Sequence, residues 1–170
     1  MGRRLERALG LSAQLAAGLG KVRDDEGAVL RALLEVADSS LTYRSRYRAA
    51  VQVAPVLDLL LVDETNPRSV GFQIAALNAI VDQLPREQRS PALSPEQRIA
   101  REAAARLRLA DVEALALADE DGARVPLAEL LADLVDQLPQ VSDQLERRYF
   151  SPAAPSRQLG PAVSEPRGQP

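Results

Sequence analysis

The stretch LLLVDETNPRS, residues 59–69, ends an apolar run with two acids and then turns through Asn-Pro-Arg. Residues 56–62 are apolar almost throughout, which is typical of a helix buried on most of its surface. Asn66 is a favoured residue for capping the start of a helix, and Pro67 is favoured at the first helical position. The stretch therefore predicts a corner between two core helices.

Helical periodicity extends to both sides of this corner, because apolar residues recur at spacings of three and four positions. A capping box, SPEQ, opens one of these segments at residues 94–97. We expect helices over residues 3–19, 24–37, 41–50, 55–62, 66–84, 94–109 and 127–149, and a short one after Asp111. The sequence thus predicts an all-α bundle of about six or seven helices.

The composition agrees with helix-on-helix packing. Hydrophobic residues make up 46% of the chain and aromatic residues only 3%, so the core is built from Leu, Val, Ile and Ala. A length of 170 residues suits one ordinary domain. Five of the twelve prolines fall in the last nineteen residues. We therefore expect one helical domain over residues 1–150 and a disordered, proline-rich tail over 151–170.

The absence of Cys and His from the sequence excludes several kinds of chemistry. Cysteine nucleophiles, Ser-His triads and the usual zinc sites cannot be built from these 170 residues. Oxygen ligands for Mg²⁺ or Ca²⁺ remain, but the sequence has no twelve-residue calcium loop, so we expect no metal and no cofactor.

The charge balance and the apolar runs also narrow the expected partners. A net charge of −3 provides no basic field for general nucleic-acid binding. The longest apolar run is far shorter than the ~20 residues of a membrane span, and the N-terminus has no signal-peptide pattern. We therefore expect a cytoplasmic protein with no membrane or nucleic-acid partner.

The charges at the corner allow two interpretations. Arg68 would lie near the start of the second helix, where the helix dipole disfavours a cation, so we expect Asp63 or Glu64 to compensate it. In one interpretation Asn66 caps the helix and an acid holds Arg68 in a purely structural pair. In the other, the acids and Arg68 line a polar pocket for a peptide, a nucleotide or a metal.

The sequence TYRSRYR, residues 42–48, poses the same choice. Its arginines, including Arg44 and Arg46, lie beside Tyr43 on one short helix and could receive a phosphate or a carboxylate. They could equally pair with the acids of the corner as a structural network. Nucleic-acid binding is a weaker third interpretation, because the cluster is short and the rest of the chain is acidic.

Glu6 and Arg7 are neighbours in the first helix, so their side chains point about 100° apart and do not pair well with each other. We expect one of them to face the interior of the bundle. A buried glutamate needs a partner, so we expect Glu6 to meet Arg44, Arg46 or Arg68 from another part of the chain.

Three stretches resemble the bacterial alpha-E family, an all-helical domain named for a Glu-Arg motif. They are GRRLERAL at 2–9, the long block ADSSLTYRSRYRAAVQVAPVLDLLLVDETNPRSVGFQIAAL at 37–77, and QLERRYF at 144–150. The motif would here be Glu6-Arg7. The resemblance is to the C-terminal half of the family's domain, which implies a fragment, a split gene or a misplaced start.

The resemblance implies a biological setting. Alpha-E domains occur beside or fused to a circularly permuted ATP-grasp ligase, often near a transglutaminase-like protease. The implied function is a non-catalytic binding or scaffold module of a bacterial system that makes or processes peptide amide bonds. The implied partners are the ligase, the transglutaminase-like protein or the missing N-terminal half of the domain.

The alternative is a catalytic domain in which Glu6, Asp63, Glu64 and Arg68 form a magnesium or phosphate site for amide chemistry. Convergence of these side chains with Tyr43 in one open pocket would favour the enzyme, and separate pairs would favour the scaffold. A half-domain should also leave apolar surface uncovered, so we expect an exposed patch along the Leu5–Leu19 helix or its neighbours, and possible self-association.

Overall fold

The computed structural model describes residues 1–48, 50–85 and 92–150. Over these ranges the protein has eight α-helices, two π-helical segments and no strand, which confirms the all-α prediction. The expected disordered tail over 151–170 lies outside the described residues. The elements in chain order are α1 (Gly2–Leu19), α2 (Glu26–Val36), α3 (Ser40–Tyr47), α4 (Val53–Leu57), η1 (Asp58–Val62), α5 (Val70–Asp82), α6 (Pro95–Arg108), α7 (Val112–Ala116), α8 (Val125–Leu145) and η2 (Glu146–Phe150).

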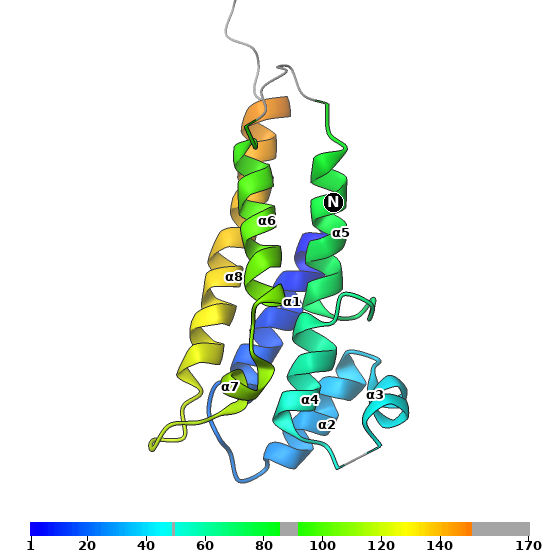
Figure 1. The fold of residues 1–170 in the computed structure, drawn as a ribbon, viewed down its shortest axis with the longest axis vertical. Helices are drawn as coiled ribbons and strands as arrows, with labels where there is room; N and C mark the ends of the chain where they lie inside the picture. Colours follow the sequence, from blue (N-terminus) through cyan, green and yellow to red (C-terminus); the bar gives the residue numbers. More distant parts are fainter. Residues whose placement is uncertain (49, 86–91, 151–170) are drawn as a thin grey trace, which may run out of the picture.

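The four longest helices form a bundle in which each contacts two others. Helix α1 packs against α5 and α8, and α6 packs against the same two helices, so the four surround one core (Figure 1). The short helices α2, α3, α4 and α7 gather at one end of this bundle. The described residues form eight helices where about six or seven were expected, because α4 and α7 are separate helices of only five residues each.

The core is built from the apolar stripes that the sequence predicts. Helix α8 shows this most clearly: Leu127, Leu131, Leu134 and Leu138 are fully buried, and the helix continues through Pro139 as expected. The capping box predicted at the start of α6 is confirmed, with the Gln97 side chain accepting a hydrogen bond from the backbone of the cap residue at 3.2 Å.

The apolar face of α1 is covered, so the exposed patch expected along this helix or its neighbours does not lie along α1 itself. Its residues Leu5, Ala8, Leu11, Leu15 and Leu19 are all buried, because α5 and α8 lie against them. Large apolar side chains are exposed elsewhere, at Val22, Val36, Leu41, Leu109, Leu117, Val125, Val135, Tyr149 and Phe150. No helix of the described ranges is long and apolar enough to cross a membrane.

The predicted corner between core helices is present, but its geometry differs from the expectation. The apolar segment runs through α4 into the π-helical turn η1, in which the Asp63 N–H donates to the Asp58 carbonyl, five residues back, at 3.0 Å. The next helix, α5, does not begin at Pro67. It begins at Val70, and its cap is Ser69, whose Oγ accepts from the Phe72 N–H at 3.0 Å.

The start of α5 lies directly against the end of η1. A Cβ atom added at Gly71 would be only 2.6 Å from the Val62 carbonyl oxygen. Glycine is therefore required here by close approach of two backbones, and this contact fixes how α5 leaves the corner.

Candidate functional site

The charges of the corner do not form one centre. Asp63 pairs with Arg46 of α3, whose Nη1 donates to Asp63 Oδ2 at 2.6 Å. The N–H and hydroxyl of Thr65 both donate to Asp63 Oδ1 at 2.7 Å. Burial alone would raise the pKa of Asp63, but the hydrogen bonds from Thr65 and Arg46 outweigh it and lower that pKa. Asp63 thus anchors its own loop to α3.

The predicted pairing of Arg68 with Asp63 or Glu64 is wrong. Glu64 turns toward α6 and accepts from Arg108, at 2.6 Å from Nε and 3.1 Å from Nη2. Arg68 turns toward the loop between α2 and α3 and donates from Nη2 to Asp38 at 2.8 Å. Each charge of the corner therefore has a different partner.

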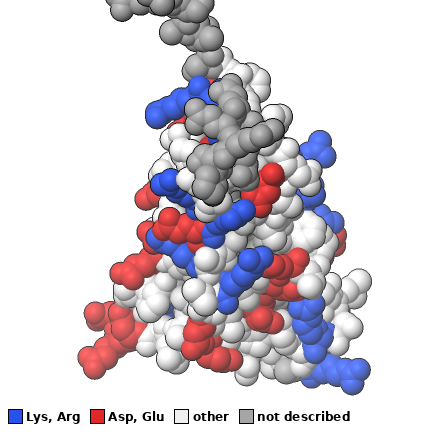
Figure 2. Space-filling model, turned by 45° about the horizontal axis from the view of Figure 1, so that its top comes forward, with Lys and Arg blue, Asp and Glu red and all other residues white. Residues whose placement is uncertain are grey.

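Figure 2 shows how the charged side chains are distributed over one face of the protein. Acidic and basic side chains are mixed across the middle of this face, while acidic ones predominate at its lower left and basic ones along its right edge. Among the described residues, no group of three or more His, Cys, Asp or Glu side chains lies close enough together to hold a metal ion.

The tyrosines of α3 serve the local structure. Tyr43 is buried, and its hydroxyl donates to the Ala50 carbonyl at 3.2 Å and accepts from the Gln52 N–H at 3.2 Å. Its ring lies 4.9 Å from that of Tyr47, whose hydroxyl donates to Asp58. Burial and this hydrogen bond raise the pKa of Tyr47 to about 12. The pair of rings therefore ties α3 to the chain that follows it and to η1.

Arg44 is the remaining predicted residue of the Arg-rich helix. Its side chain is exposed and forms no hydrogen bond or ion pair with a described residue. Asn66 has a structural role other than the predicted one. It is 6% exposed, donates from Nδ2 to the Leu59 carbonyl at 3.0 Å and accepts from the Arg68 N–H at 3.1 Å. Asn66 thus connects the turn before α5 to the carbonyl of Leu59 in η1, and it does not cap α5.

The expectation that Glu6 is buried against an arginine is also wrong. Glu6 is exposed, because Leu5 and the apolar residues spaced from it occupy the interior face of α1. The polar contact between α1 and α5 is made by Arg4, which donates from Nη1 to Gln73 Oε1 at 3.0 Å. The Arg4 guanidinium also lies 5.3 Å from the centre of the Phe72 ring.

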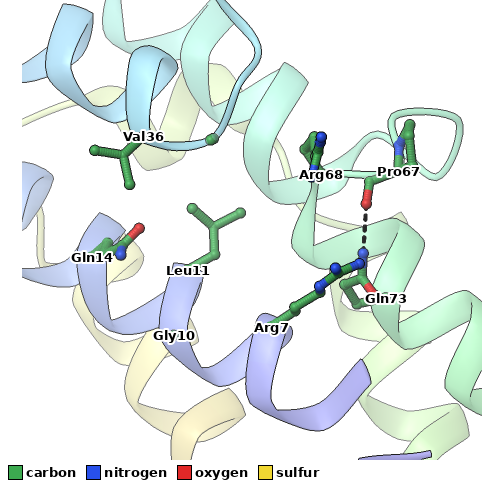
Figure 3. A pocket seen from close by; sticks show the side chains of 9 residues that line it. Arg7, Gly10, Leu11, Gln14, Val36, Pro67, Arg68 and Gln73 are labelled. Carbon is green, nitrogen blue, oxygen red and sulfur yellow. Dashed lines mark hydrogen bonds between the residues drawn. The ribbon is translucent and has the colours of Figure 1, made fainter. Parts of the chain in front are cut away.

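Two of the predicted residues, Arg7 and Arg68, do come together. They line one surface hollow of about 240 Å³ between α1, the end of α2 and the turn before α5. In Figure 3 the Arg7 side chain extends from α1 toward Gln73 and the turn of Pro67 and Arg68. The hollow is lined by Arg7, Gly10, Leu11, Gln14, Val36, Ala37, Pro67, Arg68 and Gln73. It is the candidate binding site of the described structure.

Reasoning from the sequence missed two ion pairs of the described residues that have a buried member. Arg124, whose side chain is 4% exposed, pairs with Glu26 at 2.6 Å, and Glu96, at 3% exposed, pairs with Arg148 at 2.7 Å. The sequence did contain a signal for the first of these pairs, because Arg124 directly precedes the apolar stripe of α8 and is the N-cap residue of that helix. A cation there needs compensation for the same reason as was argued for Arg68.

Comparison with known proteins supports the resemblance. The model of the alpha-E family, described as a predicted alpha-helical domain with a conserved ER motif, matches residues 1–150. Over 147 residues the chain is 40% identical to uncharacterised proteins of Mycobacterium bovis and of two strains of Mycobacterium tuberculosis. The match covers 85% of this chain and 16% of each relative, so the chain spans about one sixth of their length. No solved structure matches the chain.

Proposed function

The chain belongs to the alpha-E family, and we propose that it is a non-catalytic binding or scaffold module of a bacterial system in which an ATP-grasp ligase builds peptide amide bonds. Its partner is the ligase or the transglutaminase-like protein of that system, or the rest of a longer alpha-E domain.

The observation that carries this proposal is the separation of the charged side chains. A catalytic centre brings its acid, its base and its electrostatic groups within reach of one reacting atom. Here Asp63, Glu64 and Arg68 are held by three different partners, and Glu6 lies apart from them in solvent. Pairs of this kind fix loops and surfaces, which is what a binding module needs.

The lengths of the relatives give further support. In the mycobacterial proteins the matching segment is 16% of the chain, so there the domain is covalently joined to much longer sequence. A helical domain in that position works beside other segments. The strongly exposed Leu109 and Leu117, which flank α7, are suitable anchors for such a contact, since exposed apolar side chains gain most from being covered.

Biolayer interferometry with the immobilised ligase and the purified domain tests the proposal. We expect saturable binding that weakens several-fold in a Leu109→Ser/Leu117→Ser variant. Val135→Ser, an exposed apolar residue on α8, is the matched control and is expected to bind normally. Sedimentation analysis of the free domain shows whether the same leucines support self-association.

Two results would overturn the proposal. One is the absence of binding to the ligase, to the transglutaminase-like protein and to the rest of a longer alpha-E domain. The other is formation or hydrolysis of amide bonds by the isolated domain, with ATP and Mg²⁺ present, and its loss on Glu64→Ala or Arg68→Ala. The second result would establish the catalytic alternative.

A further inference from the structure

Arg7 is an uncompensated cation beside a second cation. Its side chain is exposed on α1 and forms no hydrogen bond or ion pair with a described residue. Arg68 lines the same hollow, and within the described part of the chain it pairs with Asp38, whose side chain is itself 79% exposed. Two cationic side chains that line one hollow repel each other, and a bound anion would reduce that repulsion.

The position of Arg7 in the sequence gives a second reason to assign it a ligand. The family is described by a conserved ER motif, and this chain contains Glu-Arg at residues 6–7 in α1 and at 146–147 in η2. The first of these places Arg7 at the hollow. An exposed arginine contributes little to packing, so an ER motif placed at residues 6–7 in α1 favours a binding role for Arg7.

The size and charge of the hollow restrict the anion. Its volume of about 240 Å³ is below the roughly 300–1,000 Å³ of sites for drug-sized ligands, so it suits a small anionic group better than a whole nucleotide. Arg7 and Arg68, partly neutralised by Asp38, leave one net positive charge. A carboxylate carries one negative charge and matches it, whereas a phosphate ester carries about 1.5 to 2.

The rest of the lining favours a peptide as the carrier of that carboxylate. Leu11, Val36 and Pro67 provide apolar walls, and the exposed amide of Gln14 forms no hydrogen bond with a described residue. We propose that the Arg7–Arg68 hollow binds a peptide carboxylate, with an aliphatic side chain of the peptide against Val36 and a backbone group on Gln14. This site goes beyond the proposed function and does not require the ligase.

Three short peptides test the ligand class on the full chain by NMR titration at low salt. Acetyl-Leu-Ala has a free terminal carboxylate, acetyl-Leu-Glu-amide has a side-chain carboxylate, and acetyl-Leu-Gln-amide has neither. We expect at least one of the acidic peptides to shift the amide signals of Gly10, Val36 and Gln73, and the stronger binder identifies the source of the carboxylate. Equal binding of the neutral peptide, tighter binding of inorganic phosphate, or shifts confined to other surfaces would overturn the proposal.

Variants with opposite expected effects test the residues. Arg7→Gln should weaken binding about five- to tenfold, because a charge-assisted hydrogen bond is lost. Arg147→Gln removes the arginine of the other Glu-Arg pair and should leave affinity unchanged. Asp38→Asn should tighten binding, because it releases Arg68, and Asn tolerates the left-handed backbone at this position, where φ is 50°. Unchanged affinity in both Arg7→Gln and Asp38→Asn would refute the assignment.

Discussion

Arg124 and Glu26, 98 positions apart in the sequence, are joined by a 2.6 Å ion pair at the end of the bundle. The same guanidinium donates to the Leu19 carbonyl at 3.1 Å and to the Ala116 carbonyl at 2.9 Å. One side chain at the start of α8 thus connects the ends of α1 and α7 and the first turn of α2.

Replacing Arg124 with Met should lower the free energy of unfolding by about 2–4 kcal/mol, because the buried Leu19 carbonyl, the partly buried Ala116 carbonyl and Glu26 lose their donor. Urea denaturation at pH 7 measures the change. Arg101→Met, which breaks an exposed pair with Asp82, is the matched control and should cost less than about 1 kcal/mol. Equal losses in the two variants would contradict a central role for Arg124.

Gly71→Ala should destabilise the fold by about 2–4 kcal/mol, because its Cβ would collide with the Val62 carbonyl and force α5 away from η1. Gly10, in the middle of α1, has no atom within 4 Å of its Cβ position. Gly10→Ala should therefore stabilise the protein by about 0.5–1 kcal/mol. Thermal unfolding of the two variants is expected to shift in opposite directions, and a Gly71→Ala variant as stable as the unaltered protein would disprove the close approach.

Stability should depend on pH through Tyr47. Its pKa is raised to about 12 in the folded protein from an ordinary 10.0, so the folded state holds this proton more tightly than the unfolded state. The stabilisation is complete below pH 10 and is lost as the pH rises toward 12. Ultraviolet titration should show a tyrosinate signal near pH 12 that is absent in Tyr47→Phe, and its persistence in that variant would exclude the assignment.

Asn66→Asp keeps the shape of the side chain but removes the donor that satisfies the Leu59 carbonyl. At pH 7 the carboxylate would face a carbonyl oxygen, so we expect a loss of about 2–3 kcal/mol in unfolding free energy. Protonation restores a donor, and the difference from the unaltered protein should therefore shrink as the pH falls from 7 to 4. A difference that is independent of pH would show that Asn66 does not act through this hydrogen bond.

The helices were predictable because their signals are local. The capping box at the start of α6 and the leucine stripe of α8 each involve residues within one or two turns of one another. Asp111, before the short helix α7, is of the same kind, since its side chain accepts from the N–H groups of Glu113 and Ala114.

The partners of the charges were not predictable, because they depend on which helices become neighbours. Glu64 meets Arg108 across 44 positions, and Arg68 meets Asp38 across 30, although Asp63 is only five residues from Arg68. A cation at the start of a helix does have a partner here, as the helix dipole requires. The need for a partner is greater for Arg124, because its side chain is buried and water cannot solvate its charge.

The π-helical turn η1 makes the corner sensitive to the number of residues and not only to their identity. Removing one residue from 58–62 would return this turn to α-helical spacing and rotate everything after it by about 100°. Asn66 would leave the Leu59 carbonyl, Ser69 would leave the Asp63 carbonyl, and Gly71 would no longer face Val62. An in-frame deletion of a single leucine codon here would therefore be far more damaging than exchange of that leucine for another apolar residue.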